Sequence, residues 1–224
     1  MKGTLVNSGA IIAGSIVGIA AGNRLPDRFK TIIMQAIGLS VLVIGLKMAL
    51  SGEKPVATVG CVAAGAITGE LLRIENGIAW IGKWLKKSFR SNSSHFVEGF
   101  VYATVLYLTG VMAIVGPIQD GTAGDASLLY IKSYLDGFAS IVLASSLGIG
   151  VAFSALPIFL VQGSITLLAS SLTFLQEPHI LNAIISTGGV LILGIGFNLL
   201  DIKKIPVGNF IPAIVYAIMW AWLQ

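Results

Sequence analysis

Residues 29–50 of the chain read FKTIIMQAIGLSVLVIGLKMAL, and this stretch decides the fold class. Lys30 and Lys47 are its only charged residues, and apolar side chains fill most of the other positions. The hydrocarbon core of a bilayer is about 30 Å thick, so a helix needs about 20 predominantly apolar residues to cross it. We therefore predict that residues 29–50 form a membrane-spanning helix.

The rest of the chain has the same character. Charged residues make up 11% of the 224 positions, against about a quarter in ordinary soluble domains, and the mean hydropathy is +0.90. So few charges could not cover the surface of a water-soluble enzyme, and that class is excluded. The sequence predicts an all-α fold, a polytopic transmembrane helical bundle of about eight spans. The other expected spans are Gly3–Ala21, Val56–Leu72, Phe96–Val115, Ser133–Phe153, Pro157–Leu175, Ile180–Leu200 and Val207–Leu223.

Two features of these spans concern their packing and their division. Gly14, Gly18 and Gly22 form a doubled GxxxG ridge, which predicts a permanent first helix packed closely on a neighbour. Between Gly137 and Gln176 there is no charged residue, and Pro157 alone marks a turn. Both two full spans and a re-entrant pair are therefore open for residues 133–175.

The basic residues predict the orientation of the chain. The net charge is +4, but the basic residues are spread between apolar runs, so we expect no nucleic-acid partner. Connections on one side carry four Lys or Arg residues and those on the other carry ten. The four are Lys2, Lys47, Lys54 and Lys132, and the ten are Arg24, Arg28, Lys30, Arg73, Lys83, Lys86, Lys87, Arg90, Lys203 and Lys204. The richer side should be cytoplasmic, which places both termini outside.

The first and last thirds of the chain resemble each other. An offset of 151 positions pairs Gly38 with Gly189, Leu42 with Leu193, Gly45 with Gly196, Pro55 with Pro206 and Val56 with Val207, and an offset of 155 pairs Asn7 with Gln162. Corresponding helices would cross the membrane in opposite directions, which is the inverted repeat of many transporters. Chance similarity between apolar helices is the alternative interpretation. The predicted organisation is one membrane domain with segments 1–75, 76–95, 96–156 and 157–224.

The longest connection has an amphipathic pattern from Ile74 to Arg90. Apolar residues recur at helical spacing, and two tryptophans stand beside a basic face. The residues that would contact lipid headgroups are Trp80, Lys83, Trp84, Lys86, Lys87 and Arg90. The pattern predicts a helix on the membrane surface that contacts anionic headgroups. Docking of a cytoplasmic partner is the alternative.

The sequence contains no signature of an enzyme. Metalloprotease, nucleophile-elbow, phosphate-loop and dinucleotide motifs do not occur. His95 and His179 lie in separate connections and Cys61 is the only cysteine, so we predict no catalytic residues, no cofactor and no metal site.

Polar residues inside apolar spans are the natural candidates for a pathway, because they usually face protein or a water-filled cavity. Asn7 and Gln162 correspond in the repeat, and their amides both donate and accept; an interhelical hydrogen bond is the structural alternative. Glu70 and Asp136 are candidate coupling-ion carboxylates, although each has a basic residue within helical reach for a local ion pair. Further candidates are Ser164, Thr166 and Asn198.

Several segments together resemble a known family. They include Ile114-Val115-Gly116-Pro117-Ile118-Gln119-Asp120-Gly121, Lys132-Ser133-Tyr134-Leu135-Asp136-Gly137, Phe153-Ser154-Ala155-Leu156-Pro157 and the opening Asn7-Ser8-Gly9. Their order and spacing resemble the YqgA/YdfK-type family of bacterial inner-membrane proteins, a domain of unknown function. The resemblance implies a multi-pass protein of the bacterial cytoplasmic membrane and attaches no activity to it.

Taken together, these patterns favour a transporter or channel-like protein that moves a small polar solute or ion by alternating access of inverted repeats. A non-transporting scaffold or signalling protein that acts through the basic amphipathic helix is the alternative. The glycine ridges also permit a homo-oligomer.

Overall fold

The computed structural model describes residues 1–22, 26–91, 93–109 and 112–223, and their regular structure is entirely helical. Arg24, which the orientation argument counts, lies outside the described residues. The helices are α1 Lys2–Gly22, α2 Asp27–Leu50, α3 Pro55–Leu72, α4 Ile74–Ser88, α5 Phe96–Leu108, α6 Met112–Thr122, α7 Ser127–Leu147, α8 Gly150–Phe153, α9 Ala155–Leu167, α10 Pro178–Leu199 and α11 Pro212–Trp222. Three short 3-10 turns, Ala169–Ser171 (η1), Thr173–Gln176 (η2) and Val207–Phe210 (η3), complete the set.

Six helical segments in the described residues are long and apolar enough to cross a membrane, or up to seven if α5 and α6 are one bent span. The predicted span 96–115 corresponds to α5 and the first part of α6, whose axes differ in direction by 61°, so this segment is either one bent span or a re-entrant pair. The predicted span 207–223 is a 3-10 turn followed by the short helix α11. The prediction of a polytopic all-α bundle is confirmed.

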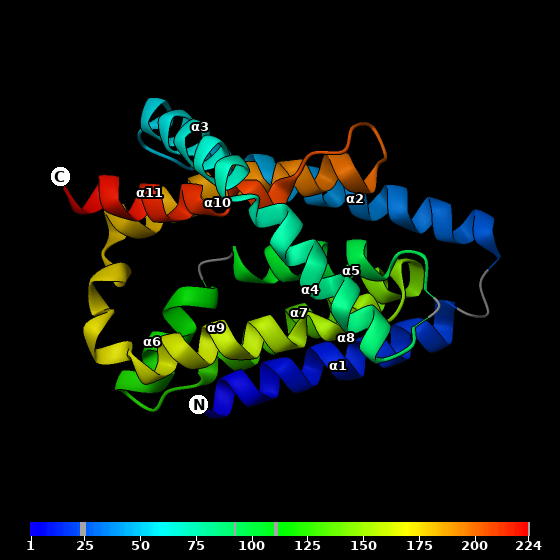
Figure 1. Ribbon diagram of the computed structural model, residues 1–224. Coiled ribbons are helices and arrows are strands. Elements are labelled where there is room, and N and C mark those ends of the chain that lie inside the picture. The colour runs from blue at the N-terminus through cyan, green and yellow to red at the C-terminus, as the bar shows by residue number, and fades with distance from the viewer. Residues whose placement is uncertain (23–25, 92, 110–111, 224) are drawn as a thin grey trace.

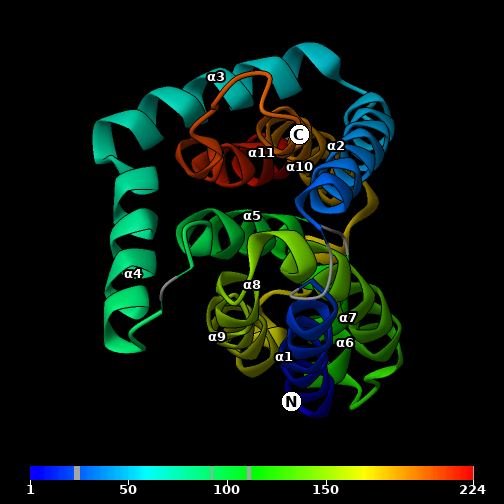
Figure 2. The same ribbon diagram turned by 90° about the vertical axis from the view of Figure 1, so that its right-hand side faces the viewer.

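The helices form two layers (Figures 1 and 2). One layer holds α2, α3, α10 and α11, and the other holds α1, α6, α7, α8 and α9, with α5 between them. Helix α4 runs along one side from the first layer to the second. The two ends of the chain lie toward the same end of the molecule (Figure 1). Helix α2 exposes Leu39, Val43, Leu46 and Leu50 on its outer face, an arrangement suited to lipid.

Helices α1 and α7 form the most extensive contact in the second layer. A Cβ atom at Gly14, Gly18 or Gly22 would meet the backbone carbonyl of Gly137, Ile141 or Ser145, respectively. The constant offset between these partners means that α1 and α7 run parallel. The predicted glycine ridge is therefore confirmed, and α7 is the neighbour on which it packs.

Helices α2 and α10 form the corresponding contact in the first layer, and they run antiparallel. Gly38 faces Leu199 and Leu200, and Gly189 faces Met48 and Ala49. The offset of 151 pairs Met48 with Leu199 and Ala49 with Leu200, so the two contacts are exchanged when the two helices are exchanged. The contacts of Gly45 with Leu193 and of Gly196 with Leu42 exchange in the same way. This interface is reciprocal at four glycines.

The turn between α7 and α9 differs from the prediction. The chain changes direction at Gly148, whose φ of 75° favours glycine, and not at Pro157. Pro157 lies in the first turn of α9, where its missing N–H removes no helical hydrogen bond. Ser127–Leu147 and Gly150–Leu167 are separate candidate spans, so the re-entrant alternative for residues 133–175 is not favoured.

Candidate functional site

A buried ion pair lies inside the second layer. The Nζ atom of Lys132 donates to Oδ2 of Asp136 at 2.7 Å, one turn along α7, and the two residues are only 5% and 6% exposed. Helix α7 begins at Ser127 and rises about 1.5 Å per residue, so Asp136 lies about 13.5 Å from its start. The predicted local pair of Asp136 and Lys132 forms, and it does so well inside an apolar span.

Two amides extend this ion pair into a network across three helices. Nδ2 of Asn7 on α1 donates to Oδ2 of Asp136 at 3.0 Å and to Oε1 of Gln162 on α9 at 3.3 Å. Asn7 and Gln162 are both fully buried. Nearby, the hydroxyls of Thr4 and Thr166 are 3.5 Å apart. Because Thr4 precedes Asn7 whereas Thr166 follows Gln162, these two contacts show that α1 and α9 run antiparallel. The two residues paired by the offset of 155 thus meet each other directly.

Each amide also has one buried polar atom without a hydrogen-bond partner among the described residues, Oδ1 of Asn7 and Nε2 of Gln162. The orientation of the Asn7 amide is fixed because the opposite orientation would place its oxygen against the Asp136 carboxylate. The orientation of the Gln162 amide is fixed because the opposite one would place its nitrogen against Nδ2 of Asn7. A buried polar group without a partner costs about 1–3 kcal/mol. The site therefore offers one free acceptor and one free donor.

The network, which is formed by Asn7, Lys132, Asp136 and Gln162, carries no net charge. Lys132 neutralises Asp136, so a bare cation at this carboxylate would also face an ammonium group. The free acceptor and donor suit a small polar molecule or water. Groups of three or more His, Cys, Asp or Glu residues that could hold a metal ion do not occur in the described part of the chain.

A family described as a protein of unknown function (DUF554) matches residues 2–222. The chain belongs to the DUF554 family. It is 33% identical over 219 residues to the uncharacterised membrane protein YdfK of Bacillus subtilis (strain 168), covering 96% of this chain and 93% of that protein. It is 29% identical over 220 residues to the uncharacterised protein YqgA of Escherichia coli (strain K12), covering 96% and 94%. No solved structure matches the chain. The predicted family is thus confirmed, and the chain is a membrane protein with several apolar helices.

Four of the predicted pathway residues of this DUF554 chain do not belong to the network: Glu70, Ser164, Thr166 and Asn198. Glu70 is not paired with Arg73 in the described contacts and instead accepts from Nδ2 of Asn209 at 2.6 Å. Asn198 binds the backbone of Ile205 through both amide atoms, at 2.7 and 2.8 Å, and holds the loop after α10. Ser164 is exposed, and its hydroxyl bonds a carbonyl of its own helix. Thr166, by contrast, is buried beside Gln162.

Residues that sequence analysis did not single out complete the surroundings of the network. The hydroxyl of Tyr107 on α5 lies 2.8 Å from that of Ser140, and Nζ of Lys132 lies 5.9 Å from the centre of the Tyr107 ring. Asp120 on α6 is 7% exposed and accepts from the backbone N–H of Gly3. The signal for Asp120 was present in the sequence, because it is a carboxylate at the end of an apolar run.

The predicted amphipathic segment forms a helix, α4. Trp80 and Trp84 are 66% and 56% exposed, and Leu85 is buried against the bundle. On the basic face Lys83, Lys87 and Arg90 are exposed and Lys86 is half-buried. At the start of α4, the carboxylate of Glu75 accepts from the N–H of Gly208 at 2.6 Å, and burial raises the pKa of Glu75 above its ordinary value. Helix α4 is thus anchored at its first turn and presents its tryptophans outward.

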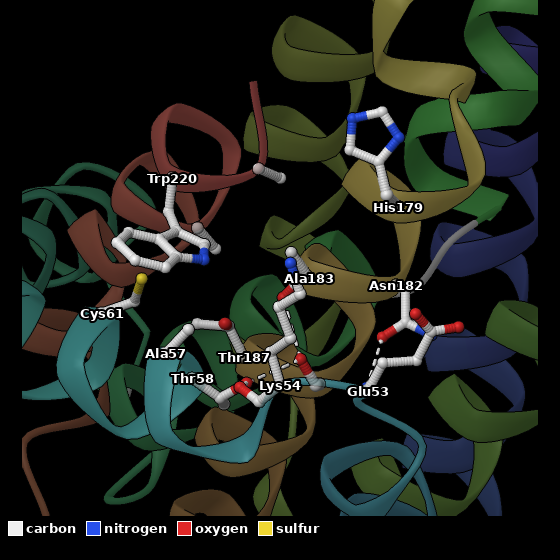
Figure 3. Close-up of a pocket in the computed structure, with 13 residues that line it drawn as sticks. Glu53, Lys54, Ala57, Thr58, Cys61, His179, Asn182, Ala183, Thr187 and Trp220 are labelled. Atoms are coloured by element: carbon white, nitrogen blue, oxygen red, sulfur yellow. Dashed lines mark hydrogen bonds between the residues drawn. The ribbon is translucent and has the colours of Figure 1, made fainter. Parts of the chain in front are cut away.

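Two polar cavities lie at opposite ends of α10. The wide cavity, of about 930 Å³, borders the C-terminal end of α10 and the start of α2. The narrow cavity, of about 100 Å³, borders the N-terminal part of α10 and the start of α3 (Figure 3). Lining residues of the wide cavity include Lys30, Thr31, Gln35, Glu98, Asn198 and Lys204, and those of the narrow cavity include Glu53, Thr58, Cys61, Asn182, Ser186 and Trp220.

Proposed function

We propose that this protein moves a small polar solute or ion across the bacterial cytoplasmic membrane, by alternating access of two inverted three-helix repeats. The network of Asn7, Lys132, Asp136 and Gln162 is the proposed binding site. The observation that carries the proposal is the pair of buried amide atoms without partners, because an unsatisfied donor and acceptor inside a membrane are costly unless a ligand or water uses them.

The packing of the helices supports the repeat. Each helix of the first proposed repeat packs on its counterpart in the second, α1 on α9, α2 on α10 and α3 on α11. All three pairs run antiparallel, since Gly65 faces Ala213 and Gly69 faces Asn209 in the third pair. A two-fold axis in the membrane plane relates such pairs, and it lets the two repeats exchange conformations.

The charge of the network favours a neutral or zwitterionic solute over a bare ion. The Asp136 carboxylate is already paired at 2.7 Å with Lys132, so an added cation would have to displace an ammonium group. A solute with one N–H or O–H and one carbonyl or hydroxyl oxygen could satisfy Asn7 and Gln162 together. The orientation follows from the basic connections, with both termini outside and α4 on the cytoplasmic surface.

Light scattering from proteoliposomes after an osmotic upshift tests this function. Vesicles holding the protein are exposed in turn to urea, glycerol, glycine and potassium chloride, and entry of a solute is read as re-swelling. We expect re-swelling with at least one solute to be several-fold faster than in empty vesicles, and to be lost in Asn7→Leu and Gln162→Leu. Thr68→Val is the matched control, because that hydroxyl bonds carbonyls of its own helix. Re-swelling that is equal in the wild type and both network variants would contradict the proposal.

The exposed face of α4 favours a second candidate function, a membrane scaffold that acts through a cytoplasmic partner. Trp80 and Trp84 lie next to each other on this face with basic residues around them. Replacing Lys83, Lys86 and Lys87 by Gln should then abolish partner capture and leave solute entry intact. The network variants should do the reverse if transport is the function.

A further inference from the structure

An apolar groove of about 530 Å³ lies between α1, α4, α8 and α9. This volume is within the range of about 300–1,000 Å³ that is usual for ligand pockets. Most of its lining side chains are apolar, and they include Ile12, Ile16, Ile19, Leu85, Phe89 and Leu156. Among the described residues that line it, Ser8 alone has a polar side chain, and its hydroxyl lies 3.5 Å from the carbonyl oxygen of Ala155. The groove therefore suits a hydrocarbon chain.

The groove follows α1 on a different face from the glycine ridge that packs on α7. Ser8 and Ile19, the first and last residues of α1 that line it, are eleven positions apart. At about 1.5 Å per residue they are separated by about 16.5 Å along the helix. The hydrocarbon core of a bilayer is about 30 Å thick, so each leaflet contributes about 15 Å. The groove is thus as long as the acyl region of one leaflet.

The last turn of α4 closes one end of the groove. Figure 2 shows α4 beside α8 and α9. The ring of Phe89 on α4 packs against that of Phe153 on α8, with 4.6 Å between the ring centroids. Helix α8 directly follows the end of α7, where Ser145 meets Gly22 at the end of α1. The last turn of α4 therefore lies near Ile19 and away from Ser8.

This end of α4 has an excess of positive charge. From Lys83 to Arg90 the chain has four basic residues and no acidic residue. Lys86 lies three positions before Phe89, so the two side chains are neighbours on the helix surface, and Arg90 follows Phe89 directly. Neither Lys86 nor Arg90 forms an ion pair with another described residue. Basic side chains in this position attract the phosphate of an anionic lipid headgroup.

We infer that the groove binds one acyl chain of an anionic phospholipid, whose phosphate lies at Lys86 and Arg90 and whose chain runs along α1 toward Ser8. The charge at one end and the length of one leaflet together define this occupant. Such a lipid joins α4 to α1 and α9, the helices that hold Asn7 and Gln162. The inference does not depend on the proposed transport.

Native mass spectrometry tests the inference. The protein is released from detergent micelles that hold equal amounts of phosphatidylglycerol and phosphatidylcholine with identical acyl chains, and the retained lipids are counted. Ile16→Trp and Leu156→Trp fill the groove from two different helices, at positions that are 61% and 48% exposed, so the core stays intact. Val43→Trp is the matched control, because Val43 is 68% exposed on the outer face of α2.

The headgroup contact is tested with Lys86→Gln and Arg90→Gln, each of which removes one positive charge. Lys203→Gln is the control for the loss of one charge, since Lys203 is exposed in the loop after α10. We expect the wild type to retain several-fold more phosphatidylglycerol than phosphatidylcholine. Lys86→Gln and Arg90→Gln should lower the retention of phosphatidylglycerol alone, and Lys203→Gln should leave it unchanged.

The groove variants have a different expected result. Ile16→Trp and Leu156→Trp should lower the retention of both lipids several-fold, because the indole takes the place of the chain, and Val43→Trp should lower neither. Equal retention of the two lipids by the wild type, or unchanged retention in both groove variants, would overturn the inference. A dimer that holds no lipid and dissociates in Ile16→Trp would overturn it as well, because the groove would then belong to a contact between two copies of the chain.

Discussion

Two glycine-lined helix pairs hold this protein together, α1 with α7 and α2 with α10, and they differ in what else they carry. In the first pair Gly14, Gly18 and Gly22 press on backbone carbonyls, and the same two helices hold the buried ion pair and the Asn7 amide. In the second pair the contact is reciprocal, and its outer face is apolar. Close approach of helix backbones at glycines is thus common to both layers, whereas only the layer of α1, α7 and α9 contains the network of Asn7, Lys132, Asp136 and Gln162.

The largest expected effect is on the charged layer. Lys132→Met leaves the Asp136 carboxylate buried without its partner, and breaking a buried ion pair in this way costs about 3–5 kcal/mol. The double variant Lys132→Met, Asp136→Leu removes both charges and should recover most of that loss in the free energy of unfolding. Unfolding by added denaturing detergent measures both variants. Equal free energies of unfolding for the wild type and Lys132→Met would contradict the expected cost of leaving the Asp136 carboxylate without its partner.

The next largest effect concerns the parallel glycine contact. Gly18→Ala places a methyl group against the carbonyl of Ile141, and overpacking of this kind costs about 1–3 kcal/mol. Gly9→Ala on the same helix is the control, because its methyl group would have no neighbour within 4 Å. We expect the midpoint of thermal unfolding to fall in the first variant and to stay level or rise in the second. A fall of the same size in both would show that the close contact of Gly18 with Ile141 is not its cause.

A smaller effect is expected at the reciprocal contact. At Gly45 an added Cβ would lie 2.8 Å from the nitrogen of Leu193 and 3.0 Å from the oxygen of Gly189, which is less severe than at Gly18. Gly45→Ala should therefore cost about 1 kcal/mol, at the low end of overpacking penalties. The same thermal assay checks it. A larger loss at Gly45 than at Gly18 would contradict the order expected from these distances.

The smallest effect is a pH dependence outside both pairs. Burial raises the folded-state pKa of Glu75, so the protonated form is favoured by folding. The contribution to stability is present at low pH and is lost as the pH rises from about 4.3, the ordinary glutamate value, through the raised pKa. Glu75→Gln should flatten the dependence of the unfolding midpoint on pH in this range. A slope that persists in Glu75→Gln would assign it to another group.

Hydropathy and small-residue spacing were sufficient for much of the fold. Residues 29–50 predict α2, and the ridge of Gly14, Gly18 and Gly22 predicts a close neighbour, because length and side-chain size act locally. The bend between α5 and α6 and the turn at Gly148 could not be predicted in this way, since apolar periodicity reports exclusion from water and carries no information about tilt or depth.

The candidate site was predicted in part. The offset of 155 positions identified Asn7 and Gln162 as corresponding residues, and the apolar residues around Asp136 identified it as a candidate. The partner of Glu70 was missed, because Asn209 is 139 positions away and the local choice of Arg73 was the obvious one. The two buried amide atoms without partners are a property of the three-dimensional arrangement, so no sequence pattern could reveal them.

The most direct test of the account is an experimental structure of the protein in lipid nanodiscs, at a resolution that reveals ordered water. We expect density for water or a small solute within hydrogen-bond distance of both Oδ1 of Asn7 and Nε2 of Gln162. An interior with both amide atoms packed dry against apolar side chains would contradict the proposal that this network is a binding site.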